Sequence, residues 1–154
     1  MTRASDLTER LSSIKERIAQ ACERSGRDPE SVTLVAVSKT CANSDIQVLY
    51  DAGHRDFGEN YVQEWEGKAN ALADDVRWHF IGGLQSNKAK NVVNRVELIQ
   101  GVDRLSLAQA ISKRATNPQK ILIQINTGND DAKGGVEPSD ALAFCDRCQA
   151  LPNL

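Results

Sequence analysis

The sequence lacks several features that mark large classes of protein. None of its apolar runs approaches the roughly 20 residues that a helix needs to cross a bilayer. The formal net charge of -2 over 154 residues leaves no excess positive charge for binding nucleic acid. The first residues contain no apolar stretch of the kind found in signal peptides, which predicts a cytoplasmic location. We therefore expect neither a membrane nor a nucleic acid as a partner.

Cysteine is also scarce, and the four cysteines fit the reduced thiols of a cytoplasmic protein. Cys145 and Cys148 have the spacing of a redox motif, but they fall in a helical pattern, with no second pair and no nearby histidine. This spacing is weak evidence for a metal site or for disulfide exchange, and we expect no metal. Internal repeats, low-complexity segments and linkers are absent as well, so residues 1–154 are predicted to form a single domain.

What the sequence contains is an alternation of strand and helix patterns. Apolar residues at helical spacing predict a first helix that begins at a cap on Ser5 or Asp6 and ends at Gly26. A second helix is predicted between a cap at Asn43 or Ser44 and Gly53. A third helix is predicted to begin within residues 58–64, and further helices are predicted over 86–93, 106–114 and 139–150. Strands are predicted over 32–38, 54–57, 78–81, 96–100 and 121–126.

This alternation is typical of βαβ units and a parallel sheet, so the predicted class is α/β. Polar and glycine residues gather after successive strands, which is the layout of a (β/α)8 barrel of the TIM type, whose site is built at the carboxyl ends of its strands. A complete barrel of this type has at least about 200 residues. Only about five of its eight units are therefore expected here, in a C-terminally incomplete domain.

Lys39 is the first candidate functional residue, because it follows the apolar strand pattern of residues 32–37. At a strand end, a lysine that is partly withdrawn from water has a depressed pKa, and its neutral amine can attack a carbonyl to form a Schiff base. The alternative is a lysine that only extends from the strand end into solvent.

Four other candidate residues lie on or directly after the later strands, and three of them have a structural alternative. Asn60 could cap the following helix. His79 could be a core histidine whose hydrogen bonds are satisfied, and Gly82 would let the backbone approach a ligand closely. Lys133 could belong to an ordinary surface loop. The structural alternatives do not explain why so many polar residues gather at one rim.

Four segments at these positions resemble the signature segments of the pyridoxal phosphate homeostasis protein family. They occur in the family's order and at its spacing, and the similarity covers essentially the whole chain. The segments are Val35-Ala-Val-Ser-Lys-Thr40, Phe57-Gly-Glu-Asn-Tyr-Val-Gln-Glu64, His79-Phe-Ile-Gly-Gly-Leu-Gln-Ser-Asn-Lys88 and the stretch from Ile125 to Gly134.

The resemblance implies the barrel of alanine racemase and pyridoxal 5'-phosphate (PLP) as the cofactor, held as a Schiff base on Lys39. It places Asn60, His79 and Gly82 beside the cofactor and makes Lys133 a candidate for a secondary contact. It further implies a role in PLP (vitamin B6) homeostasis without enzymatic turnover, with PLP and apo PLP-dependent enzymes as partners. The alternatives are a PLP-dependent racemase or related enzyme, an aldolase that uses Lys39 without a cofactor, and a barrel without a ligand.

The sequence departs from the family at two places. Many relatives follow the lysine and threonine with a basic residue and proline, where this chain has Cys41 and Ala42. The family's C-terminal glycine- and serine-rich loops and an arginine-bearing strand, which hold the phosphate and face the pyridine nitrogen, have no counterpart in the 154 residues. The chain alone is therefore expected to keep the covalent anchor and to lose most of the grip on the phosphate.

Overall fold

Strands and helices alternate in the computed structural model, which describes residues 2–128, 130 and 134–154. The helices are α1 (Arg3–Ser25), α2 (Asn43–Asp51), α3 (Val62–Ala69), α4 (Ala89–Val92), α5 (Leu105–Ser112) and α6 (Ala141–Gln149). The strands are β1 (Ala36–Val37), β2 (Asp56–Glu59), β3 (Arg77–Phe80), β4 (Leu98–Val102) and β5 (Lys120–Ile123). Short 3₁₀ turns lie at Pro29–Ser31, Ser86–Lys88 and Pro138–Asp140.

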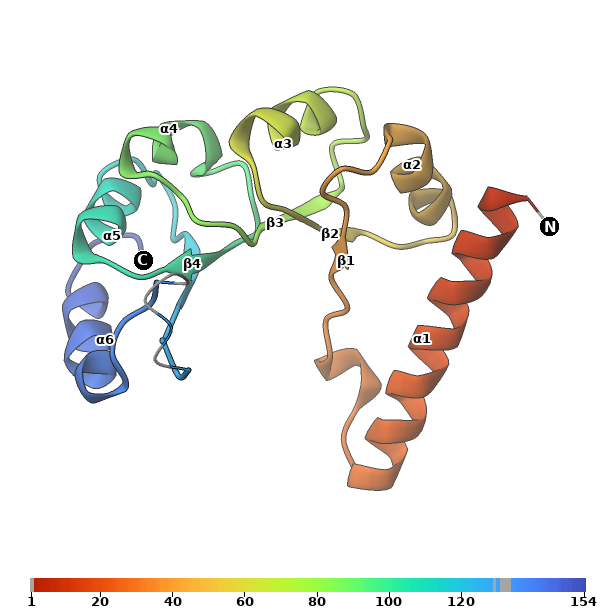
Figure 1. Ribbon diagram of the computed structural model, residues 1–154, viewed down its shortest axis with the longest axis horizontal. Helices are drawn as coiled ribbons and strands as arrows, with labels where there is room; N and C mark the ends of the chain where they lie inside the picture. The colour runs from red at the N-terminus through yellow and green to blue at the C-terminus, as the bar shows by residue number, and fades with distance from the viewer. Residues whose placement is uncertain (1, 129, 131–133) are drawn as a thin grey trace.

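The strands form one five-stranded sheet in the order β1-β2-β3-β4-β5, and every neighbouring pair is parallel. Helices α2 to α5 follow one another along one face of the curved sheet, with α1 and α6 at its two ends (Figure 1). Each helix returns the chain so that the next strand pairs in the same direction. The structure therefore confirms the α/β class and contains five successive strand–helix units of the predicted barrel.

The hydrophobic core lies between the sheet and these helices. Phe57 of β2 pairs in register with Trp78 of β3, and both side chains are buried on the helix-facing side. Phe80, Ile99, Leu107 and Ile111 extend this core along the sheet. Because side chains alternate along a strand, the next register pair, Gly58 with His79, points to the opposite, concave face. The helix-facing side of the sheet thus holds the packed core, and the concave side corresponds to the interior of a complete barrel.

The first strand differs from its prediction. A buried strand was expected over residues 32–38, but only Ala36 and Val37 have strand geometry. Within the described residues β1 pairs with β2 alone, so it is an edge strand, and Val37 is 53% exposed. A continuous apolar, β-branched run indicates burial on both faces, but it does not indicate how many neighbouring strands pair with it, and here β1 has one such neighbour among the described residues.

The predicted N-cap residues of two helices are not the ones that the structure shows. Thr2 caps α1 by accepting the Ser5 N–H at 3.2 Å, one turn before the predicted cap, whereas Gly26 ends this helix with φ 64°, as predicted. Helix α2 begins at Asn43, and its N-cap residue, Ala42, makes no side-chain cap bond. A short polar residue near a helix start is necessary for a side-chain cap but does not specify which turn begins the helix.

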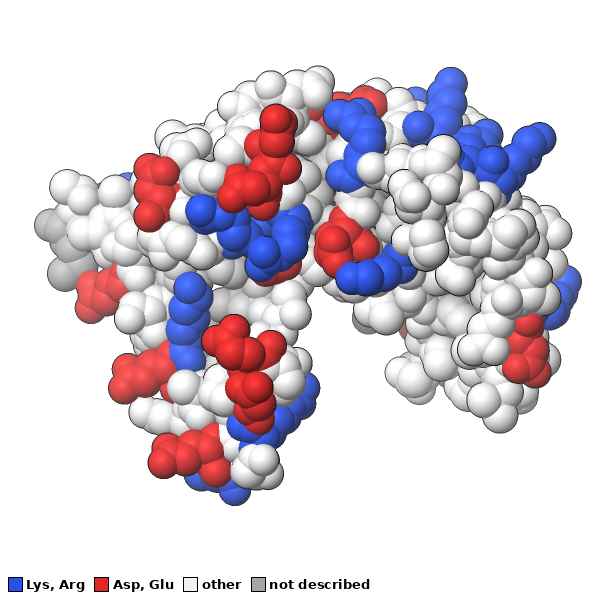
Figure 2. All heavy atoms as spheres, turned by 180° about the vertical axis from the view of Figure 1, so that it is seen from behind, with Lys and Arg blue, Asp and Glu red and all other residues white. Residues whose placement is uncertain are grey.

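On the face seen in Figure 2, acidic and basic side chains lie among each other over the left half, whereas mainly basic side chains gather at the upper right. The same view shows the molecule hollowed on its lower side, between the end that carries α1 and the end that carries α6. Within the described ranges, no helix combines the length and the apolar character that crossing a bilayer requires.

Candidate functional site

Lys39 lies in a tight turn directly after β1. The turn is closed by the Cys41 N–H, which donates to the Ser38 carbonyl at 3.0 Å, so that Lys39 and Thr40 are its two central residues. The Ser38 N–H still donates to the Gly58 carbonyl at 2.9 Å, which anchors the start of the turn to β2. Lys39 itself is exposed, and within the described part of the chain no hydrogen bond or ion pair holds its ammonium group. Of the two interpretations of Lys39, the structure shows the one in which the side chain extends from the strand end into solvent, and not the one in which it is partly withdrawn from water.

A second lysine, Lys68 of α3, is buried beneath this turn at 5% exposure. Its Nζ donates to the Ser38 carbonyl at 2.7 Å, to Glu59 Oε1 at 2.7 Å and to Glu64 Oε1 at 2.6 Å. Glu59, fully buried at the end of β2, also accepts the Ser38 hydroxyl at 2.6 Å, while its Oε2 has no partner among the described residues. All three ammonium hydrogens of Lys68 are thus used in a buried network under the turn.

The charges of this network stabilise one another. Burial lowers the pKa of Lys68, but the hydrogen bonds to Glu59 and Glu64 outweigh it, so its pKa lies above the ordinary value. The hydrogen bond from Lys68, with a further one from the Thr40 N–H, lowers the pKa of Glu64 despite some burial. Both groups are therefore charged at neutral pH, and the backbone of the turn is held by ions.

Two of the predicted site residues, Asn60 and Gly82, lie against each other at the next two strand ends. The Ile81 N–H donates to the Glu59 carbonyl at 2.9 Å, which brings the chain after β3 beside the chain after β2. A Cβ atom on Gly82 would lie 2.3 Å from the Asn60 carbonyl oxygen, so only glycine fits there. The alternative that Asn60 caps α3 is not found, because Tyr61 holds the N-cap position and no side chain makes a cap bond. Lys39, Asn60 and Gly82 therefore follow three adjacent strands at the same edge of the sheet.

His79 is buried within β3, at 4% exposure, and faces the concave side. Its Nε2 lies 3.0 Å from Asp56 Oδ1, and its Nδ1 lies 3.5 Å from the Gln100 amide nitrogen. Asp56 also receives two hydrogen bonds from Arg77, at 3.0 and 2.6 Å. These contacts are those of a histidine with structural partners, and a contact of His79 with a cofactor stays a prediction.

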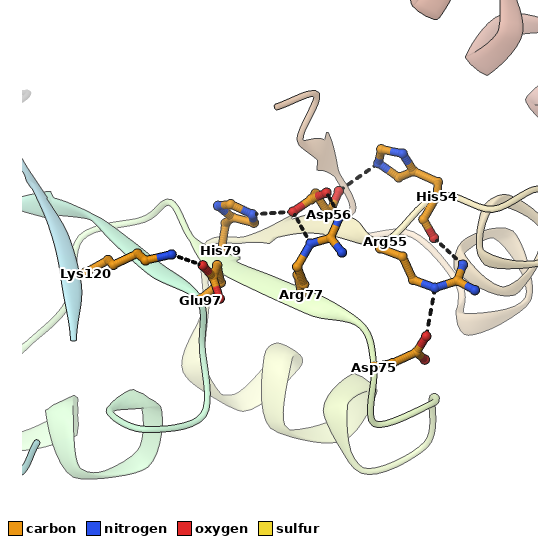
Figure 3. A network of polar contacts seen from close by, with 8 residues as sticks. All are labelled: His54, Arg55, Asp56, Asp75, Arg77, His79, Glu97 and Lys120. Atoms are coloured by element: carbon orange, nitrogen blue, oxygen red, sulfur yellow. Dashed lines mark hydrogen bonds and ion pairs between the residues drawn. The ribbon is translucent and has the colours of Figure 1, made fainter. Parts of the chain in front are cut away.

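Figure 3 shows that His79 belongs to a polar network near the amino ends of the strands. The His54 Nε2 donates to the Asp56 carbonyl at 2.8 Å, and Arg55 pairs with Asp75 at 2.9 Å in the same region. Lys120 and Glu97 form a further ion pair at the neighbouring strands. Burial raises the pKa of Asp56, but the hydrogen bonds from Arg77 and His79 outweigh it, so its pKa lies below the ordinary value. This network fixes the end of the sheet opposite to Lys39.

Trp65 of α3 is buried in the core, whereas Tyr61, one turn before it, is 62% exposed. Tyr61 lines a pocket of about 370 Å³ together with Asn60, Gly83 and Lys88, between the start of α3 and the segment after β3. This pocket opens beside the strand ends that carry the predicted site. Lys133 lies outside the described residues.

Sequence reasoning did not find Lys68 or assign a role to Glu59. The i, i+4 spacing of Glu64 and Lys68 on one helix is a signal that favours an ion pair. It does not indicate that the pair is buried or that it contacts the turn, because those contacts join segments 30 residues apart. Within the described residues, no group of three His, Cys, Asp or Glu side chains lies close enough to hold a metal ion. What the site offers chemically is a free primary amine on a firmly held turn.

Comparison with known proteins gives consistent matches over nearly the whole chain. Residues 10–154 match the family described as alanine racemase, N-terminal domain. The chain is 44% identical over 150 residues to a pyridoxal phosphate homeostasis protein of Aquifex aeolicus, covering 95% of this chain and 66% of the relative. It is 39% identical to the protein of the same name from Pseudomonas aeruginosa, covering 97% of this chain and 67% of the relative.

Solved structures agree with these matches. PipY of Synechococcus elongatus with PLP bound superposes with a TM-score of 0.79 at 36% identity, covering 96% of this chain and 66% of PipY. An unknown protein from Bifidobacterium adolescentis superposes with a TM-score of 0.85 at 33% identity, covering 98% of this chain and 67% of that protein. The chain thus spans about two thirds of the length of the relatives that it matches.

Proposed function

Because the chain belongs to the alanine racemase N-terminal domain family, we propose that it binds PLP and takes part in intracellular PLP homeostasis. The observation that carries this proposal is the amine of Lys39. It is exposed, it is unpaired within the described residues, and it lies in the turn after the first strand, where a parallel α/β fold collects its functional side chains. A structural relative that is 36% identical has PLP bound.

The residues at this edge of the sheet fit a cofactor that carries an aldehyde. The Lys39 amine adds to the aldehyde carbon and one water leaves, so that a Schiff base forms without any oxidant or reductant. When bound, PLP supplies an electron-withdrawing ring that stabilises negative charge on an attached carbon. Asn60 and Gly82 are proposed as neighbouring cofactor contacts, with His79 further along the concave face. Lys133 remains a proposed secondary contact on the basis of the sequence.

We propose a binding and delivery role without turnover. Turnover on an amino acid needs a positioned proton donor and acceptor at the substrate carbon. The buried His79 has its ring nitrogens beside Asp56 and Gln100, and Tyr61 is 62% exposed. The relatives are named for homeostasis and not for a reaction. Loss of deuterium from α-labelled alanine or serine would instead support the racemase alternative.

The test of PLP binding is Lys39→Ala, with Lys90→Ala as the matched control because Lys90 is an exposed lysine on α4. Each purified protein is mixed with PLP, reduced with borohydride, digested and analysed by mass spectrometry. We expect a pyridoxyl adduct on Lys39 in the wild type and in the control, and loss of the absorption of bound PLP in Lys39→Ala. An equal yield of bound PLP in Lys39→Ala after dialysis would contradict the proposal. A sugar-derived adduct on Lys39 would favour an aldolase.

The proposal extends to partners and location. An exposed lysine that holds PLP could release it to another amine, so apo PLP-dependent enzymes are the proposed recipients. All four cysteines are free in the structure, which supports a reducing compartment and hence the cytoplasm. The test is the recovery of activity by an apo enzyme mixed with the PLP-loaded chain. The control is the apo enzyme mixed with free PLP at the concentration that the chain releases into solution. Direct delivery predicts that activity recovers faster with the PLP-loaded chain than in this control.

A further inference from the structure

The turn that carries Lys39 is held from below by two side chains of α3. The Ser38 carbonyl, just before Lys39, accepts Lys68 Nζ at 2.7 Å. The Thr40 N–H, just after it, donates to Glu64 Oε1. Glu64 and Lys68 are themselves bonded at 2.6 Å. The backbone groups on both sides of Lys39 are therefore fixed by one ion pair on a single helix turn.

The backbone conformation of Thr40 indicates what the Glu64–Lys68 ion pair stabilises. Thr40 has φ 62°, in the left-handed region, and it occupies the third position of a turn where glycine is favoured. A β-branched residue is strained there and keeps this geometry only where its surroundings impose it. The hydrogen bond from its N–H to an ionised carboxylate is of the strong, charge-assisted kind. Glu64 is therefore placed to hold the strained residue next to Lys39.

We propose that Glu64 and Lys68 are positioning residues that hold the strained turn and so keep the Lys39 amine exposed and available to an aldehyde. We call the Glu64–Lys68 pair the clamp. Lys68 also bonds to Glu59 on β2, so the clamp connects the turn to the sheet as well as to α3. This inference rests on the proposed function of Lys39 and deepens it by naming the side chains that set the geometry of its backbone.

The primary variant is Glu64→Ala, because the Glu64 side chain is 26% exposed and its loss leaves Lys68 with two acceptors. Glu64→Gln is the conservative variant, since its amide oxygen can still accept the Thr40 N–H. Lys68→Met removes the cation. Glu66→Ala is the matched control, because Glu66 lies on the same helix and bonds to Asn91 of α4 at 2.8 Å.

The first readout needs no cofactor. Hydrogen exchange of the Thr40 amide, measured by NMR, should be about tenfold faster or more in Glu64→Ala, because a hydrogen bond to a charged group is lost. Exchange in Glu64→Gln should be intermediate, and exchange in Glu66→Ala should match the wild type. Unchanged protection of the Thr40 amide in Glu64→Ala would overturn the proposal. Lys68→Met keeps the Glu64 acceptor but loses its cation and the contact with the Ser38 carbonyl, so exchange of the Thr40 amide in this variant should also be intermediate.

The second readout is the initial rate at which PLP and borohydride label Lys39, which should fall about tenfold in Glu64→Ala. Adding Thr40→Gly to Glu64→Ala should restore much of the rate, since glycine adopts a positive φ without strain. A role of Glu64 in global stability alone would not be rescued in this way, so failure of the rescue also counts against the clamp.

The two proposals fail separately. No adduct on wild-type Lys39 defeats PLP binding, and the clamp is then judged by Thr40 exchange and by reductive methylation of Lys39 with formaldehyde. A wild-type adduct that forms at the same rate in Glu64→Ala supports PLP binding and defeats the clamp.

Discussion

The buried pair of Lys68 and Glu59 makes a sharp prediction about stability. The two side chains are 6% and 0% exposed, and Nζ lies 2.7 Å from Oε1. At that separation and an effective dielectric of about 20, Coulomb's law gives roughly 6 kcal/mol of attraction, most of which offsets the cost of removing both charges from water. The net contribution of the intact pair is therefore small, whereas breaking it from one side is costly.

Lys68→Met leaves the Glu59 carboxylate buried, with Ser38 as the one donor to Oε1 among the described residues and none to Oε2. We expect the free energy of unfolding to fall by about 3–5 kcal/mol. Glu59→Gln removes the negative charge and leaves Lys68 with Glu64 and the Ser38 carbonyl, so it should cost only about 1–3 kcal/mol. The double variant should cost at least about 1 kcal/mol less than the sum of the two single variants.

Urea unfolding followed by tryptophan fluorescence measures these values, because Trp65 and Trp78 are 1% and 4% exposed in the native core. The slope of the unfolding free energy against urea should stay the same in all four proteins, which shows that the same surface unfolds. Additive costs, or a cost below about 1 kcal/mol for Lys68→Met, would show that the lysine is not paired in a buried site.

Three further predictions concern other parts of the fold. Gly82→Ala should destabilise by about 1–3 kcal/mol because its Cβ would lie 2.3 Å from the Asn60 carbonyl oxygen, whereas Gly83→Ala, with open space around its Cβ, should be nearly neutral; thermal unfolding compares the two. Burial lowers the pKa of His54, so its contribution to stability is complete above its unfolded pKa of about 6.5 and is lost as pH falls through the lower folded value. Urea unfolding between about pH 7 and 4.5 should show this loss, and a His54→Gln variant with an equally steep pH dependence would contradict it. Arg3→Ala should change the free energy of unfolding only slightly, and less still in high salt, because the Arg3 side chain that pairs with Asp45 of α2 is 73% exposed; a large loss in urea unfolding would mean that α1 is anchored mainly by the Arg3–Asp45 ion pair.

The order and type of the strands and helices could be predicted from the sequence, because the apolar period differs between a buried strand and an amphipathic helix. Each of the five strands overlaps its predicted range, and the CxxC segment lies in a helix, α6, as predicted. The length of β1 was wrong, since strand geometry ends where a pairing partner ends and the partner is far away in sequence. The cap of α1 was wrong for a related reason, because several polar residues compete at the start of a helix.

The position of Lys39 after the first strand could also be predicted, because strand order places it at the carboxyl edge of a parallel sheet. Its exposure could not, since that depends on how the turn is held and on what covers β1. Neither the sequence spacing nor the family resemblance assigned a role to Lys68, although it makes three hydrogen bonds under the turn. The predicted contacts of His79 and Asn60 with a cofactor remain predictions.

By itself, the sequence determined the alternation of elements, the parallel sheet and the amine at the end of its first strand, because these follow from local periodicity and from the direction of the chain. The tertiary structure decided which lysine is exposed and which is buried. That difference arises from contacts across 4 to 30 residues, where Glu64, Glu59 and the Ser38 carbonyl surround one ammonium group and leave the other free among the described residues. Two lysines with the same intrinsic chemistry thus acquire opposite roles from the surfaces around them.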